Sequence, residues 1–351
     1  MTLNTCISES IERYCMQLIP DGDLVLCKLD DLPNRHKINC FNTYTPEQYK
    51  ENSDAFINPY EDEILWTKIY NSKVHEDYIY NPASLVYLPF ELQKNVAETS
   101  STGVAAHLNI SEAIASGILE LIERDTLMIN HFQDLNPPEL DINSVLSNVR
   151  SPDFIRKILS NYNVKIYKLF SDIKIPIFLA YVWTDDGGLH LGIGASASLD
   201  AEQGIFKAFQ ECLFTYFYSK NMLHLRKTIK DDISSLYEHF LYYQSNYFFG
   251  LIKNRDVIQF ENVQFNPSYL DNQLSENNLD VYYKNLTTPD IESLPIQVVK
   301  VVIPGLIDLN KSFKLRRLGA RRFWEVPGKL GLRCSAKLFD EPHPFPYRNA
   351  V

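Results

Sequence analysis

The most regular hydrophobic pattern in the chain covers residues 111–132, where apolar side chains recur three and four positions apart. That spacing places them on one face of a helix, so it predicts a long helix here. Asn109 or Ser111 is suited to cap its N-terminus, and the acidic Glu112 in the first turn interacts favourably with the helix dipole. We expect two further long helices, at residues 5–18 and 199–222.

Short stretches with the composition of strands alternate with these helices. Residues 296–303 are almost continuously β-branched, which is typical of a strand buried on both faces. Residues 30–62 are polar and predict surface loops, whereas residues 228–275 look helical and rich in aromatic residues that serve packing. Strands that alternate with long helices predict an α/β or α+β fold class. The other expected strands are residues 23–28, 84–89, 164–170, 176–183 and 189–195.

One pattern occurs twice in the chain. Residues 6–13 and residues 117–124 both contain Glu-x-x-Glu-Arg in apolar surroundings, which suggests two related halves. At helical pitch, residues three apart differ by roughly 60° in azimuth and about 4.5 Å in rise, so both carboxylates of a copy share one face. The residues are Glu9, Glu12 and Arg13 in the first copy and Glu120, Glu123 and Arg124 in the second.

Carboxylates this close together need a cation. The Arg that follows can pair with a carboxylate or with a phosphate, although a solvated Glu–Arg ion pair has the same pattern. Apolar neighbours such as Ile11 and Ile122 place at least some of the acids near a packed interior. Four Glu side chains that converge on one cleft would form an oxygen-rich site, suited to Mg²⁺ held between the protein and nucleotide phosphates.

Composition narrows the class of protein. The 351 residues are 45% hydrophobic, enough for a sizeable core, and the net charge of −10 at pH 7 argues against a general nucleic-acid or anionic-membrane binder. A local basic stretch at residues 311–322 could still meet phosphate. The six cysteines form no zinc or redox spacing, and neither a signal peptide nor a membrane-spanning stretch is present, so we expect a cytoplasmic protein with reduced thiols. No P-loop or Gly-x-Gly-x-x-Gly pattern occurs.

The duplicated segments belong to an ordered series of short stretches that resembles the YcaO superfamily. The Pro-x-Pro-x-Pro end of the series is similar to the branch that makes azoline rings in ribosomal peptides. The stretches are residues 6–13, 101–106, 111–113, 117–125, 192–195, 207–211, 302–306, 316–322 and 342–346.

The resemblance implies a fold with two related halves, in which mixed β-sheets flanked by long helices surround a central nucleotide cleft. It implies a single YcaO-like catalytic domain over residues 1–351, without the stretch that usually precedes the first Glu helix. The proline-rich tail, residues 340–351, favours an extended conformation and in such proteins reaches toward the active site. On composition alone, a disordered end is an equal alternative.

The activity implied is ATP- and Mg²⁺-dependent cyclodehydration. A Cys, Ser or Thr side chain of a precursor peptide attacks the preceding carbonyl, ATP phosphorylates the resulting oxygen, and loss of phosphate leaves a thiazoline or oxazoline. Phosphoryl transfer depends mainly on positioning and on metal ions that neutralise the phosphates, so a carboxylate cage suits this chemistry. Alternatives are backbone thioamidation with the same ATP site and a YcaO-like scaffold without catalysis.

Site residues follow from the resemblance position by position. Glu9, Glu12, Glu120 and Glu123 match the Mg²⁺ ligands, and Glu120, Glu123 and Arg124 match the catalytic group. Lys207, Phe214 and Tyr216 stand where the family usually has Arg, Gln and Arg, and a Lys cannot reproduce a guanidinium fork. The residues matched to nucleotide binding are Arg13, Ser101, Glu112, Lys207 and Glu211.

The resemblance also implies partners. These are the precursor peptide and a separate leader-recognition protein similar to ubiquitin-activating enzymes; a flavin dehydrogenase that oxidises the ring and a homodimer are further options. Nucleic acid and membrane are not expected partners. The implied products are thiazole- and oxazole-modified peptides, bacteriocins among them, and the sequence leaves open which peptide and which residue are modified.

Overall fold

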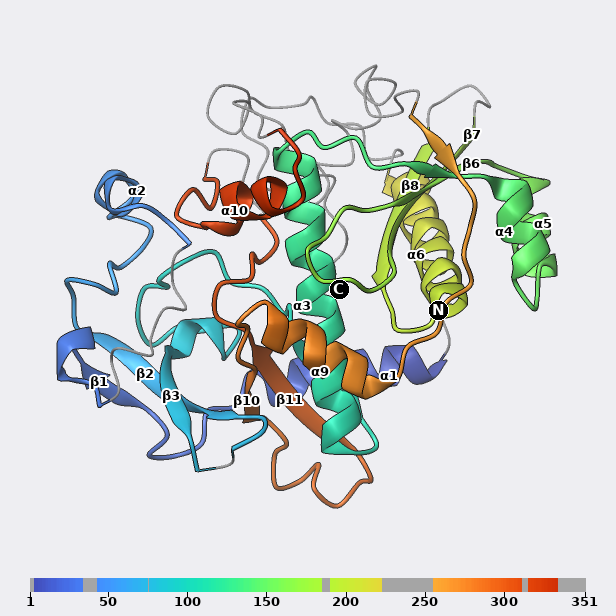
Figure 1. Ribbon diagram of the computed structural model, residues 1–351. Helices are drawn as coiled ribbons and strands as arrows, with labels where there is room; N and C mark the ends of the chain where they lie inside the picture. The colour runs from blue at the N-terminus through green and yellow to red at the C-terminus, as the bar shows by residue number, and fades with distance from the viewer. Residues whose placement is uncertain are drawn as a thin grey trace.

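A long helix between two β-sheets organises the fold (Figure 1). This helix, α3 (Ile110–Phe132), packs against strands of both sheets and so forms the centre of the largest hydrophobic cluster. Asn109 caps it as expected, because its side chain accepts a hydrogen bond from the backbone N–H of Glu112. The computed structural model describes residues 3–33, 43–74, 76–184, 190–222, 255–310 and 315–333.

The first sheet has six strands in the order β1-β2-β10-β11-β4, with β3 paired to β2. All of its pairings are antiparallel. In β11 the four central residues are buried, as the β-branched run predicts. The strands are β1 (Val25–Cys27), β2 (Ile64–Asn71), β3 (Tyr78–Pro82), β4 (Val104–His107), β10 (Tyr282–Asn285) and β11 (Gln297–Val302).

The second sheet has five strands in the order β8-β7-β6-β5-β9, and only the β5–β9 pair is parallel. Helix α6 (Ala201–Met222) packs directly on β7 and β8. This close approach requires glycine on β8, because a β-carbon on Gly194 would lie 2.2 Å from the carbonyl oxygen of Ala208. The strands are β5 (Glu139–Leu140), β6 (Asn163–Lys168), β7 (Ile177–Thr184), β8 (His190–Ala197) and β9 (Val257–Ile258).

The remaining helices surround these layers. Helix α1 packs against β4, and α10 packs against α3. None of the helices that the structure describes has the length and hydrophobicity needed to cross a lipid bilayer. The remaining helices are α1 (Leu3–Cys15), α2 (Pro46–Glu51), α4 (Ile142–Asn148), α5 (Asp153–Leu159), α9 (Pro267–Glu276) and α10 (Arg322–Lys329), with 3₁₀ turns η1 (Leu29–Asp31) and η3 (Ala83–Leu85).

Two local expectations were wrong. The strand expected at residues 84–89 is absent, and the chain there forms η3 with Val86 and Tyr87 buried in the core. The apolar run therefore reflects burial of a turn rather than a strand. The polar region 30–62 contains α2, which begins with a capping box between Thr45 and Gln48 that loop composition concealed. Residues 340–351 and most of 228–275 lie outside the described residues.

Candidate functional site

The two Glu-x-x-Glu-Arg copies lie on α1 and α3, and both helices contact β4. The Glu12 carboxylate accepts a hydrogen bond from the backbone N–H of Ala106, with an N–O distance of 2.7 Å. Glu120 accepts one from the N–H of Gly103 at 3.0 Å, and a backbone φ of 83° at this residue favours glycine. One short segment of backbone therefore holds a carboxylate from each copy.

Glu12 shows that the two copies are close enough to interact. Burial, reinforced by the neighbouring carboxylates of Glu120 and Glu9, raises the pKa of Glu12 to about 8. The hydrogen bond from Ala106 and the charge of Arg13 act in the opposite direction. A carboxyl group in this environment keeps its proton near neutral pH unless a cation is bound beside it.

On α3, Glu123 reaches the second sheet. Its side chain is buried and accepts a hydrogen bond from the backbone N–H of Ala197 on β8, at 3.1 Å. Glu211 on α6 is half-buried against the same strand, since its Cβ atom lies 2.8 Å from the position that a β-carbon on Gly194 would take. Acidic side chains from three helices therefore border β4 and β8, and α3 contributes to both.

Of the site residues, Arg124 is the best suited to bind an anionic ligand. Only 5% of the residue is exposed, yet within the described ranges its Nε and Nη1 atoms have no hydrogen-bond partner. Its Nη2 atom donates to Glu120 Oε1 at 3.2 Å. Burial disfavours the charged guanidinium, but Glu120, Glu123 and Asp308 outweigh it and hold the pKa of Arg124 above its usual value. Two fixed donors on a permanent cation fit the oxygens of a phosphate.

The other predicted residues are placed less tightly. Arg13 and Ser101 are half-buried, and the charge of Arg13 acts on Glu12. Glu112 is exposed and forms an ion pair with His107, and Lys207 on α6 is exposed. The structure thus brings Glu9, Glu12, Glu120, Glu123 and Arg124 together, whereas no contact with these residues is shown for Glu112 and Lys207.

Three positions on α6, Lys207, Phe214 and Tyr216, depart from the family pattern, and the last of them is explained by packing. Tyr216 is buried, and its hydroxyl lies 3.0 Å from Thr184 Oγ1 in a hydrogen bond across to β7. Its ring also packs edge-on against Tyr162. A tyrosine here closes the hydrophobic core of the second sheet, so the position is not available as a cationic contact.

Sequence reasoning missed a buried polar cluster beside Arg124. Lys300 on β11 donates to the carbonyl oxygens of Thr102 at 2.7 Å and Ser100 at 3.3 Å. Asp308 accepts a hydrogen bond from Ser100 Oγ at 2.6 Å; burial acts to raise the Asp308 pKa, but Arg317 and Lys300 keep it below its usual range. A lysine inside an otherwise β-branched strand was the available signal.

In the part of the chain that the structure describes, no group of three or more His, Cys, Asp or Glu side chains is arranged to hold a metal ion by itself. The residues nevertheless fit a cation shared with a ligand. Glutamate oxygens are the donors that Mg²⁺ prefers, and Mg²⁺ usually takes one or two carboxylates together with phosphates and waters. Burial and the neighbouring carboxylates raise the pKa of Glu12, and a bound Mg²⁺ would lower it.

Comparison with known proteins identifies a matching family. Residues 3–307 match the family model of the YcaO cyclodehydratase, described as ATP- and Mg²⁺-binding. This match covers both Glu-x-x-Glu-Arg copies and all the described strands of the two sheets. A comparison with curated protein sequences finds no match.

Solved structures with the same fold are similar over most of this chain. A heterocyclase in complex with substrate and cofactor has a TM-score of 0.76 and 21% identity, covering 97% of this chain and 48% of its own. The heterocyclase TruD has a TM-score of 0.71 and 21% identity, covering 97% and 50%. The YcaO protein of Methanopyrus kandleri, bound with AMPPCP and Mg²⁺, has a TM-score of 0.60 and 18% identity, covering 85% and 74%. This chain thus spans about half the length of the two heterocyclase chains.

Proposed function

Because this chain belongs to the YcaO family, we propose that it is an ATP- and Mg²⁺-dependent peptide cyclodehydratase subunit. Its substrate is a Cys, Ser or Thr residue in a ribosomally made precursor peptide, and its product is a thiazoline or oxazoline. The family description as ATP- and Mg²⁺-binding supports the cofactors. The fold that this chain shares with TruD and with a second heterocyclase supports the reaction class.

The observation that carries this proposal is the pairing of carboxylates with an unsatisfied guanidinium. Glu12 and Glu120 are held by backbone N–H groups of one segment, and Arg124 beside them has two donor atoms without a partner among the described residues. Carboxylates alone would suit many cations. The added buried donors select a ligand that brings both a metal ion and anionic oxygens, as a nucleotide triphosphate does.

Each side chain then has a specific task. When bound, Mg²⁺ would neutralise the phosphates and polarise the transferred phosphoryl group. Four glutamates would supply the metal-ligating oxygens: Glu9, and the three that backbone N–H groups hold in place, Glu12, Glu120 and Glu123. Arg124 would hold a phosphate oxygen, and its contact with Glu120 would keep both side chains in one orientation.

The test uses the full chain with its precursor peptide and leader-recognition partner. We expect ATP hydrolysis to accompany the loss of one water from the peptide for each ring formed. Mass spectrometry distinguishes this product from a thioamide, in which sulfur replaces oxygen without loss of water. Absence of both ATP hydrolysis and peptide modification in the complete mixture would contradict the proposal.

The raised pKa of Glu12 predicts a pH-dependent affinity for Mg·ATP. Since Glu12 must lose its proton to bind a cation, affinity should rise with pH up to about 8 and then level off. Calorimetry at pH 7 in buffers of different ionisation enthalpy should show proton release on binding. Glu12→Gln removes the titrating group, so any binding that remains should release no proton. Proton-neutral binding by the wild type would exclude Glu12 as a ligand.

We propose two partners, the precursor peptide and a separate leader-recognition protein similar to ubiquitin-activating enzymes. The E. coli microcin synthetase McbBCD complex, which was also solved with pro-MccB17 bound, supports such an assembly. One of its chains has a TM-score of 0.63 and 16% identity to this chain, covering 86% of this chain and 79% of its own. A flavin dehydrogenase would act later, on the finished ring, and a cytoplasmic location fits these partners.

A non-catalytic scaffold is the second candidate, and the departures on α6 favour it. Lys207 is exposed, and Tyr216 serves core packing in place of the family's second Arg. A scaffold would bind its peptide or partner enzyme without using ATP. Titration with Mg·ATP separates the two candidates, because binding supports the enzyme and absence of binding supports the scaffold.

A further inference from the structure

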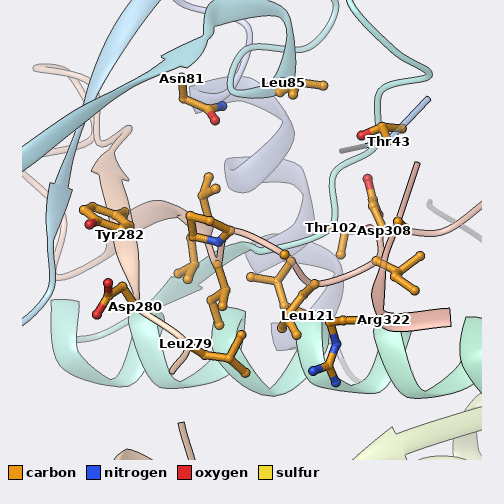
Figure 2. Close-up of a pocket in the computed structure, with 18 of the residues that line it drawn as sticks. Thr43, Asn81, Leu85, Thr102, Leu121, Leu279, Asp280, Tyr282, Asp308 and Arg322 are labelled. Carbon is orange, nitrogen blue, oxygen red and sulfur yellow. The ribbon is translucent and has the colours of Figure 1, made fainter. Parts of the chain in front are cut away.

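A pocket of about 690 Å³ lies next to the candidate site, and none of the four ligand glutamates lines it. Figure 2 shows it above α3, with Leu121 of that helix on one side and Asn81 of β3 on the other. Asp280 and Tyr282 border one end, and Asp308 borders the other. The volume is within the range of about 300–1,000 Å³ that is usual for ligand pockets.

The chemistry of the walls argues against a polyphosphate ligand. Acidic residues such as Asp77 and Asp280 line the pocket together with cations such as Arg321, so neither sign of charge dominates. Leucine side chains and side-chain amides also line the pocket. A wall that mixes apolar patches, amides and both charges fits a neutral chain that carries its own donors and acceptors, which is the character of a peptide.

Two buried polar atoms in the lining residues have no partner within the described ranges. They are the Oδ1 atom of Asn81, which is 1% exposed, and the Nε atom of Arg317, which is 4% exposed. One is an acceptor and the other a donor. A peptide bond offers both an N–H and a carbonyl oxygen, so it could satisfy both kinds of atom after small side-chain adjustments.

The pocket and the glutamate site share a wall. Ser100 and Thr102 line the pocket, and the next residue, Gly103, holds Glu120 through its backbone N–H. Asp308 also lines the pocket and acts electrostatically on Arg124. A chain bound in the pocket therefore lies one loop away from the carboxylates and the guanidinium.

We propose that this pocket binds the precursor peptide, as an extended segment that flanks the residue under modification. The inference rests on the proposed function for its link to the reaction, while the binding itself depends only on the pocket. Side-chain amides hold the peptide backbone, and the leucines accommodate small side chains. The shared wall formed by residues 100–103 sets the distance between the bound segment and the glutamate site.

The test is photo-crosslinking of the full chain with a defined probe. The probe is a mixture of acetylated, amidated heptapeptides with a central cysteine, random flanking residues and a benzophenone side chain. We expect crosslinks, mapped by mass spectrometry, on pocket residues such as Leu85 and Tyr282. Leu279→Trp fills the pocket and should abolish them, whereas the matched control Leu294→Trp, at an exposed leucine outside the lining, should not.

A milder variant covers the case in which the tryptophan disturbs folding. Asn81→Leu keeps the size of the side chain but removes the polar atom, and should weaken labelling roughly three- to tenfold. Crosslinks that map elsewhere, or labelling of both variants at the wild-type level, would overturn the proposal, as would no labelling of the wild type. Mg·ATP calorimetry on the same proteins keeps the two proposals apart. Pocket labelling without nucleotide binding would contradict the proposed function and leave the peptide-binding proposal intact.

Discussion

Glu12→Gln and Glu123→Gln each lower the affinity for Mg·ATP by at least about 100-fold, because changes even in the outer shell of a metal site cost 10–100-fold. Glutamine retains the size of glutamate and an oxygen that can accept the hydrogen bond from Ala106 or Ala197. The substitution therefore removes charge rather than packing. Isothermal titration with Mg·ATP measures the loss directly.

The control for these variants is Glu292→Gln, at an exposed glutamate outside the site. It should bind Mg·ATP like the wild type. Thermal unfolding separates loss of binding from loss of fold. Glu12→Gln should be at least as stable as the wild type above pH 8, since the raised pKa of Glu12 means that its ionisation destabilises the folded protein as pH rises from about 4.5 to 8. Wild-type affinity in either variant would remove that residue from the proposed site.

The long helices and five of the strands could be predicted from the sequence because each has a strong local signal; these strands are β1, β6, β7, β8 and β11. The α3 pattern gave its bounds to within one residue, and the Asn109 cap was readable beforehand. Strands β2, β3 and β10 were not predicted. These strands mix aromatic and polar residues. Strands β2 and β10 pair although they are distant in sequence, as Tyr282 does with Asn71, and such pairing has no local signature.

The candidate site divides in the same way. The glutamates on α1 and α3 were predicted from a repeat. In the structure, Glu12 and Glu120 accept hydrogen bonds from backbone N–H groups of one segment, residues 103–106. Lys300 and Asp308 were missed, because the cluster forms only when β11 passes beside the 100–103 segment. Contacts between residues about 200 positions apart depend on topology, which a single sequence does not reveal.

Arg322→Leu should destabilise the protein strongly, by about 3–5 kcal/mol, because it leaves the buried Asp125 carboxylate without a cation and Asp172 with Lys329 alone. The Arg322 guanidinium donates to both oxygens of Asp125, at 2.9 and 2.7 Å, and to both oxygens of Asp172, at 3.1 and 2.7 Å. All three residues are at most 8% exposed. This clamp joins α10 to α3 and to the segment after β6.

Chemical denaturation measures the loss, and Arg156→Leu is the matched control. Arg156 pairs with Asp153 at 3.0 Å, but the two side chains are 60% and 93% exposed, so its removal should change stability by less than about 0.5 kcal/mol. A similar loss in both variants would show that the clamp contributes no more than a surface pair.

The pH dependence of stability shows why Arg322→Leu is less stable than the wild type. Burial acts to raise the Asp172 pKa, but hydrogen bonds from Arg322 and Lys329 outweigh it and keep that pKa low. Asp172 therefore contributes stability in the wild type above the unfolded pKa of about 3.9, and this contribution is lost as pH falls below it. Burial already raises the pKa of Asp125 in the wild type, and in Arg322→Leu this pKa should rise further and that of Asp172 should rise as well, so stability should fall as pH rises. The gap between variant and wild type should narrow toward pH 4.

The clamp also bears on the site, because Asp125 directly follows Arg124 on α3. If Asp125 fixes this turn of the helix, a loosened clamp should weaken Mg·ATP binding as well as stability. Adding Asp172→Asn to Arg322→Leu removes one of the two buried carboxylates that lost the guanidinium, so the double variant should recover part of the lost stability. Its Mg·ATP affinity should stay low, since Asp125 still lacks its guanidinium partner. Recovery of stability together with full affinity would show that the clamp stabilises the fold without orienting Arg124.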